Sequence, residues 1–90
     1  MPDDFPTDPT EFGRCWSGVA GQLTGVKLAI VETEKRAGEA FIRREDAIAN
    51  ALRDLANHLK YTANGLSKRV EEFKNEDNRR QYEIRKKFGG

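Results

Sequence analysis

The chain has 90 residues, of which 34 % are charged and 37 % are apolar, and its formal net charge is +1. This length favours a single domain with a modest core, and the charged share exceeds the ~25 % of an average globular domain. The composition suits long amphipathic helices. The single cysteine excludes an internal disulfide. No apolar run reaches the ~18–20 residues that a membrane-spanning helix needs.

The N-terminal segment 1–8 is predicted to be a flexible acidic leader, because it contains two prolines and several aspartates. It lacks an apolar centre, so it does not resemble a secretory signal peptide. A helix is predicted to begin at Pro9. Asp8 can cap its first turn, proline suits the first helical position, and Glu11 can complete a capping box.

A first stripe of large apolar residues follows, with spacings that alternate between four and three. This spacing places them on one face of a helix, close to a coiled-coil seam. The alternation typical of strands is absent. The stripe consists of Phe12, Trp16, Val19, Leu23, Val26 and Ile30.

The segment 32–39 has no large apolar residue, and Gly38 is the predicted end of the first helix and the predicted hairpin turn. Asn64-Gly65 is the competing position for the turn, or marks a kink or the start of a third helix. A second stripe spans this dipeptide. It consists of Phe41, Ile48, Leu52, Leu55, Leu59, Leu66, Val70 and Phe73.

These elements predict an all-α fold, an antiparallel helical hairpin over residues 9–88 that pairs into a helical bundle. With a turn at Gly38, the residues after Leu66 are expected to project beyond the first helix or to fold back. A two-helix hairpin covers only one side of each helix, so the exposed apolar residues favour burial against a helical protein partner, as a homodimer or a heterodimer.

The sequence offers no arrangement typical of catalysis, so we expect no catalytic, cofactor-binding or metal site. One histidine and one cysteine make no zinc site, and the glycines match no phosphate-binding pattern. A basic C-terminal stretch could contact nucleic acid, but the nearly neutral chain disfavours this function. The basic residues are Arg79, Arg80, Arg85, Lys86 and Lys87.

Two short motifs suggest a family. Trp16-Ser17-Gly18 is a Trp-x-Gly sequence, and Phe73 and Asp77 form an aromatic-x-x-x-acid pair. Together with the Leu/Ala rhythm of residues 51–78, they resemble the small helical-hairpin substrates of type VII (ESX) secretion systems. In that family the Trp-x-Gly motif usually lies near the middle of the chain, in the turn, and the aromatic residue is usually tyrosine.

The resemblance implies a non-enzymatic hairpin that is exported as a folded pair. Phe73 and Asp77 would be part of the export signal in a flexible helix extension, and Trp16 and Gly18 would lie in the groove where it docks. We therefore expect a type VII secretion substrate or the helical targeting partner of a secreted effector, made in the cytoplasm and exported without a cleaved signal peptide. The alternatives are an intracellular coiled-coil adaptor or oligomerisation module and, less favoured, a small nucleic-acid-binding regulator.

Overall fold

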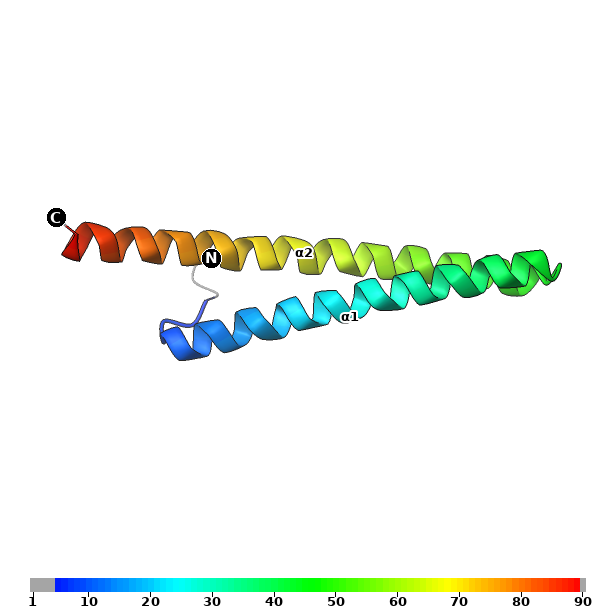
Figure 1. The fold of residues 1–90 in the computed structure, drawn as a ribbon, viewed down its shortest axis with the longest axis horizontal. Coiled ribbons are helices and arrows are strands. Elements are labelled where there is room, and N and C mark those ends of the chain that lie inside the picture. The colour runs from blue at the N-terminus through cyan, green and yellow to red at the C-terminus, as the bar shows by residue number, and fades with distance from the viewer. Residues whose placement is uncertain (1–4, 90) are drawn as a thin grey trace.

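The computed structural model describes residues 5–89 as an antiparallel helical hairpin (Figure 1). Helix α1 spans Pro9–Ile42 with 34 residues, and helix α2 spans Asp46–Phe88 with 43 residues. The molecule is a rod with extents of 67 × 24 × 18 Å. The predicted all-α hairpin is confirmed over this described range.

The start of α1 is capped as the sequence predicts. The backbone N–H of Glu11 donates a hydrogen bond of 3.3 Å to the carboxylate of Asp8, and Pro9 is the first helical residue. The cap satisfies one of the donors that a helix start leaves without a partner. The prediction that the helix begins at Pro9 is therefore confirmed.

The hairpin turn lies at residues 43–45, so both predicted positions, Gly38 and Asn64-Gly65, are wrong. Arg44 has a φ of 65°, in the left-handed region. The N–H of Glu45 donates to the carbonyl of Ala40 at 2.9 Å, and the N–H of Arg44 donates to that of Phe41 at 3.1 Å. These two bonds form a Schellman motif, with arginine in the position that glycine usually occupies.

Gly38 and Gly65 both lie inside continuous helix, because small buried residues on either side of each glycine keep α1 and α2 packed together. Ala37 and Ala40 are 5 % exposed and flank Gly38 on the side that faces α2. Ala63 is 8 % exposed and is followed by the half-buried Leu66 on the other side of Gly65. The predicted kink or third helix after Asn64-Gly65 is therefore absent from α2, which runs unbroken to Phe88.

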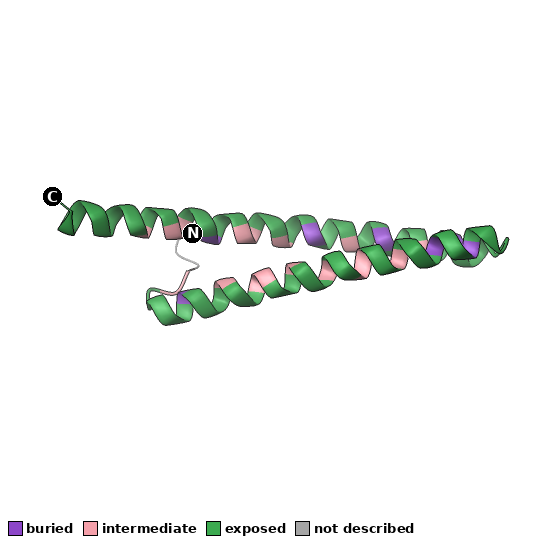
Figure 2. Cartoon of the chain, in the orientation of Figure 1, coloured by how far each residue is buried: buried purple, intermediate pink, exposed green. Residues whose placement is uncertain are grey.

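The contact between the helices follows spacings of three and four along both chains, as in an antiparallel coiled coil. On α1 the stripe of large residues continues through three smaller ones, Thr33, Ala37 and Ala40. On α2 the buried positions and most of the half-buried ones form one continuous stripe (Figure 2). This stripe consists of Ala49, Leu52, Ala56, Leu59, Ala63, Leu66, Val70, Phe73, Asp77 and Arg80.

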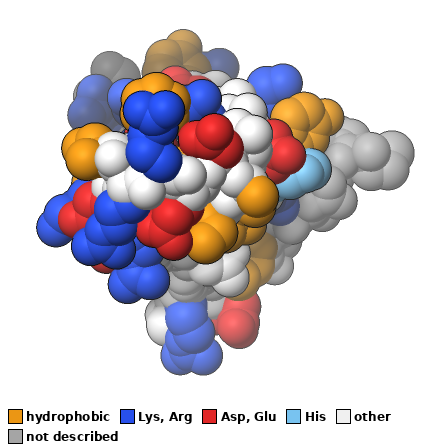
Figure 3. All heavy atoms as spheres, turned by 90° about the vertical axis from the view of Figure 1, so that its right-hand side faces the viewer, with side chains coloured by type: hydrophobic (Ala, Val, Ile, Leu, Met, Phe, Trp, Pro, Cys, Tyr) orange, Lys and Arg blue, Asp and Glu red, His pale blue; other side chains and the backbone are white. Residues whose placement is uncertain are grey.

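Three residues of the predicted second stripe lie outside this contact. Phe41 is 57 %, Ile48 51 % and Leu55 48 % exposed. Alanines fill the seam in their place, and Ala49 and Ala56 are only 2 % and 3 % exposed. Small side chains let the backbones approach closely near the turn, so the large neighbours are displaced to the flanks, where hydrophobic side chains lie among charged ones (Figure 3).

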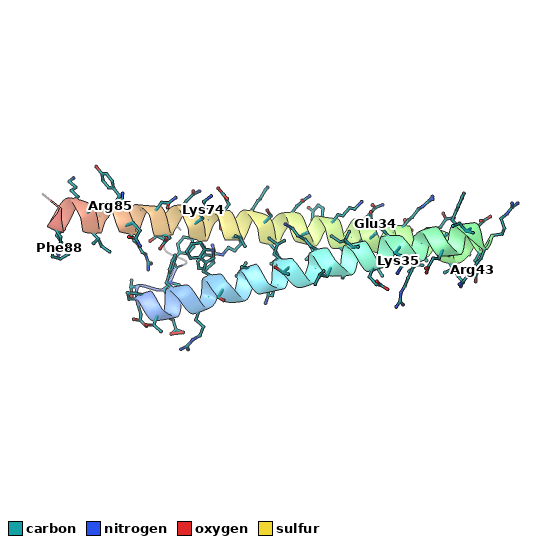
Figure 4. The ribbon with its side chains drawn as sticks, in the orientation of Figure 1. Glu34, Lys35, Arg43, Lys74, Arg85 and Phe88 are labelled. Atoms are coloured by element: carbon teal, nitrogen blue, oxygen red, sulfur yellow. The ribbon has the colours of Figure 1, made fainter. Side chains whose placement is uncertain are left out.

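The large residues instead gather at the other end, where the two helices diverge (Figure 1). Because the turn lies later than predicted, α1 accompanies α2 as far as Arg80 rather than Leu66. The side chains of residues 81–88 are exposed, and Arg85 and Phe88 lie beyond the start of α1 (Figure 4). The residues after Leu66 were expected to project beyond the first helix. In the structure only the last residues of α2, 81–88, form such an overhang.

Candidate functional site

Aromatic side chains from the N-terminal segment, α1 and α2 pack against one another at the open end of the hairpin, where the two helices diverge (Figure 1). The Phe73 ring centroid lies 5.3 Å from that of Phe12 and 4.9 Å from that of Phe5, and Trp16 lies 5.9 Å from Phe12. Phe73 is 2 % and Phe12 is 4 % exposed. Tilted and edge-to-face pairs at these separations are favourable beyond their area burial. We call Phe5, Phe12, Trp16 and Phe73 the aromatic cluster.

Phe5 belongs to the segment predicted as a flexible leader. Its ring packs on Phe73, and the carbonyl of Pro6 accepts a hydrogen bond of 2.6 Å from Arg80. Phe5 and Pro6 are thus held against α2 rather than free. The first four residues of the predicted leader lie outside the described residues.

Two arginines of α2 cover the aromatic cluster. The guanidinium carbon of Arg69 lies 4.7 Å from the Phe5 ring centroid and 4.9 Å from that of Phe73. The guanidinium carbon of Arg80 lies 4.1 Å from the centroid of Phe12. Arginine over an aromatic face is attracted to the ring quadrupole. The two guanidinium groups therefore cover parts of the aromatic cluster that α1 does not cover.

Glu76 holds two of the basic side chains in place. Its carboxylate accepts hydrogen bonds from Arg79 at 2.7 and 3.0 Å and from Arg80 at 2.8 Å. These bonds, from Arg79 first and then from Arg80, lower the pKa of Glu76 from 4.5 to about 2. The carboxylate is therefore ionised at neutral pH and fixes the orientation of both guanidinium groups.

An open groove of about 630 Å³ lies beside the aromatic cluster, between the start of α1 and the last turns of α2. Its walls combine apolar surface from Trp16 and Ile84 with the polar side chains of Asp77 and the neighbouring arginines. Apolar walls with a few charged groups can receive an apolar side chain and orient a polar one. We call this the open-end groove. Its lining residues are Thr7, Pro9, Phe12, Gly13, Trp16, Asp77, Arg79, Arg80, Gln81, Glu83 and Ile84.

The structure brings together three of the four residues that the two motifs single out. Trp16 and Asp77 line the open-end groove, and Phe73 packs below it in the aromatic cluster. Gly18 is exposed and is not part of the groove, and a Cβ added to it meets nothing within 4 Å. Phe73 lies in the packed hairpin, so the expectation that it belongs to a flexible helix extension is wrong.

The sequence interpretation missed Phe5 and Arg69, and it treated Glu76 only as an i,i+4 ion pair with Arg80 on an exposed face. Phe5 precedes the helix and follows no periodic pattern, so only the fold could place it. Arg69 and Glu76 are seven residues apart and flank the seam, and their spacing from Phe73 was the available signal, because residues three or four apart share a helix face.

No group of three or more histidine, cysteine or acidic side chains that could hold a metal ion occurs within residues 5–89. In the same range, no helix is long and apolar enough to cross a membrane. Cys15 and His58 are exposed and lie on different helices.

The chain was compared with protein-family models, with curated proteins and with solved structures, and nothing matches in any of the three comparisons.

Proposed function

We propose that this chain is a non-enzymatic helical module that binds another protein, and that the open-end groove is its recognition site. The groove is the observation that carries the proposal. It combines an apolar wall from Trp16 and Ile84 with the carboxylate of Asp77 and with two guanidinium groups that Glu76 orients, those of Arg79 and Arg80. Such a surface fits a helix that presents one apolar side chain and an adjacent polar one.

The more specific proposal is that the chain is a type VII (ESX) secretion substrate, or the helical targeting partner of a secreted effector. The support is that Trp16, Phe73 and Asp77, which carry the resemblance, meet at one end of the hairpin. Asp77 is half-buried on the groove wall, so a binding partner can contact its carboxylate without unfolding the hairpin. Phe73 then acts by positioning this surface rather than by direct contact with the secretion machinery.

The export assay uses the full chain, produced in a bacterium with an active ESX system and in the same strain with that system inactivated. The chain should accumulate in the culture filtrate of the active strain only. Asp77→Asn should reduce export at least tenfold and leave the helical circular dichroism unchanged, because the substitution keeps the side-chain shape and removes the charge.

Asp54→Asn is the matched control, because Asp54 is an exposed aspartate on the same helix and lies outside the groove. It should be exported like the wild type. Equal export of the Asp77→Asn and Asp54→Asn variants would contradict the signal at Asp77. Absence of the wild-type chain from the filtrate of the active strain would overturn the secretion proposal itself.

The second candidate is a coiled-coil adaptor or oligomerisation module. Large apolar residues that stay exposed outside the hairpin contact favour it, since a further helix would bury them; among them are Leu28 and Ile42. Stable association with another helical chain, combined with a lack of export, would select this candidate over the secretion substrate.

A further inference from the structure

The overhang of α2, residues 81–88, is not explained by the packing of the hairpin. Because α1 begins opposite Arg80, about two turns of α2 continue with no part of α1 beside them (Figure 1). The large side chains on these turns stay open to solvent, with Tyr82 65 %, Ile84 53 % and Phe88 77 % exposed. Apolar side chains that gather at one place, unlike scattered ones, mark a contact surface.

Three cations follow one another in the overhang, namely Arg85, Lys86 and Lys87. Within the part of the chain that the structure describes, none of them takes part in an ion pair. The one acid of the overhang, Glu83, lies 3.8 Å from the guanidinium group of Arg79. A helix C-terminus carries a partial charge of only about −0.5, so three cations exceed what the helix dipole requires. Their charge therefore remains available to an anion from outside the hairpin.

The apolar and basic side chains of the overhang are ordered around the helix. Ile84 and Phe88 are four residues apart and share one face, and at about 3.6 residues per turn Arg85 and Lys87 lie roughly 60° to either side of this pair. The ammonium group of Lys87 lies 5.9 Å from the ring centroid of Phe88. Arginine and lysine carry their charge on long apolar stems, which can lie along apolar surface while the charge reaches outward. An apolar face bordered by cations is typical of helices that bind the interface of an anionic membrane.

The turn end of the rod offers a contrast. It also exposes large side chains, since Phe41 is 57 % and Ile42 78 % exposed. Two arginines at 43–44 are followed there by two acids at 45–46, so these charges cancel. Figure 3 shows acidic and basic side chains together on this end. Of the two ends of the rod, the overhang alone combines exposed apolar side chains with an excess of positive charge.

We propose that the overhang binds the surface of a membrane that contains anionic phospholipids. The side chains of Ile84 and Phe88 enter the headgroup region, and the cations at 85–87 contact the acidic groups of the lipids. Interfacial binding of helices combines these two contributions, apolar burial and attraction to anionic lipid. The hairpin is then attached to the membrane by one end of the rod. This function adds to protein binding at the open-end groove and does not depend on it.

A membrane fits the overhang better than a nucleic acid does. The phosphates of a nucleic acid attract cations, and its bases stack on aromatic rings. Neither contact buries an aliphatic side chain such as that of Ile84, which lies between the cations. The headgroup region of a membrane buries aliphatic and aromatic side chains alike.

The first experiment measures co-sedimentation of the full chain with vesicles made of equal parts of phosphatidylcholine and phosphatidylserine. We expect binding that weakens as salt is added, because salt screens the attraction between exposed charges. Binding to vesicles of phosphatidylcholine alone should be weaker by about tenfold or more, because these vesicles carry no net charge.

Two pairs of lysines show whether the overhang is the part of the chain that binds. Lys86→Gln/Lys87→Gln should weaken binding to the phosphatidylserine vesicles by about tenfold or more, because each cation near the surface adds to the attraction. Lys68→Gln/Lys74→Gln is the matched control, since it removes the same charge from exposed positions of α2 outside the overhang. It should bind like the wild type.

The second experiment tests the apolar contribution. Phe88→Ala should weaken binding to the same vesicles by about fivefold, because the ring no longer leaves water. Phe41→Ala makes the same change at an exposed position of the turn end and should bind like the wild type. Ile84 is left intact, because it also lines the open-end groove. Circular dichroism verifies that each variant is as helical as the wild type.

Absence of binding to the phosphatidylserine vesicles at low salt would overturn the proposal. An equal loss of binding in the two lysine variants would also overturn it, because the overall charge of the chain rather than the overhang would then drive binding. Wild-type affinity of Phe88→Ala, or tighter binding to a DNA duplex than to the vesicles at the same salt, would reject a membrane as the target. The vesicles contain no protein, so these outcomes are independent of the export assay on Asp77.

Discussion

At the scale of single residues, the turn depends on an arginine in an unfavourable backbone conformation. Arg44 has a φ of 65°, and its N–H and that of Glu45 complete the Schellman motif. A residue other than glycine in the left-handed region is strained by about 1–2 kcal/mol. The α1 stripe continues to Ala40 and the α2 stripe begins at Ala49, so packing fixes the chain reversal between them and holds Arg44 there.

Arg44→Gly should raise the free energy of unfolding by about 0.5–1 kcal/mol, because relief of the strain outweighs the greater freedom of glycine in the unfolded chain. Chemical denaturation followed by circular dichroism measures the change. Arg43→Gly is the control. Arg43 has a φ of −79°, so glycine relieves no strain there and should lower the stability. A loss of stability in both variants would contradict the strain at Arg44.

Glu76 makes the stability of the open end depend on pH. Its pKa is lowered from 4.5 to about 2 by hydrogen bonds from Arg79 and then Arg80. A carboxylate with a lowered pKa stabilises the folded state fully above its unfolded pKa, and this contribution is lost as the pH falls through the folded pKa. The loss should therefore occur between about pH 4.5 and pH 2.

Glu76→Gln should lower the free energy of unfolding by about 1 kcal/mol at neutral pH, a modest value because the Arg79 side chain is 59 % exposed. The difference from the wild type should shrink as the pH falls below 4.5 and become small near pH 2, where about half of the Glu76 carboxylates are protonated in the folded state. Denaturation series across this range measure it, with the exposed Glu71→Gln as control. A difference that is constant with pH would contradict a role for the Glu76 charge.

At the scale of the helices, close packing near the turn depends on small residues rather than on large apolar ones. Ala37, Ala40, Ala49 and Ala56 are the most buried residues of this half of the hairpin. Large residues occupy the other half, so the helix axes diverge towards the open end (Figure 1). The gradient in side-chain size along the seam therefore gives the hairpin its wedge shape.

Ala56→Leu should destabilise the hairpin by about 1–3 kcal/mol, because the added side chain separates two closely packed backbones. Ala51→Leu adds the same atoms at an exposed position of the same helix and should change the stability by less than about 0.5 kcal/mol. Thermal unfolding of the two variants compares them directly. Equal melting temperatures would show that the helices are not in close contact at Ala56.

At the scale of the whole molecule, the aromatic cluster holds the diverging ends of the rod together. Phe73 contacts Phe5 before α1 and Phe12 within it, so one side chain of α2 ties the N-terminal segment and both helices together. The overhang beyond Arg80 contributes little to this closure, because its side chains are exposed.

Phe73→Ala should destabilise the protein by about 3–5 kcal/mol, the range for removal of a buried phenylalanine. Phe88→Ala, in the overhang where the side chain is 77 % exposed, should leave the unfolding transition unchanged. Circular dichroism melting curves measure both. If Phe73→Ala melted like the wild type, the aromatic cluster would not be the closure of the open end.

The sequence by itself determined the helical class, the cap at Asp8, the start at Pro9 and the first stripe from Phe12 to Ile30. These features are local: a cap needs neighbours in sequence, and a stripe of large residues repeats within one helix. The two motifs also singled out Trp16, Gly18, Phe73 and Asp77, of which only Gly18 lies away from the open end, but the spacing could not show which of them meet in space.

Only the tertiary structure decided where the chain reverses, which residues fill the seam near the turn, and where Phe5 lies. Alanine is compatible with both buried and exposed positions, so Ala40 and Ala49 gave no signal until the opposing helix was in place. Glycine lowers helix propensity by only about 1 kcal/mol, which packing on both sides of Gly38 and Gly65 offsets. The turn at Arg44 violates the local preference for glycine, because burial along the two helices outweighs the strain of one residue.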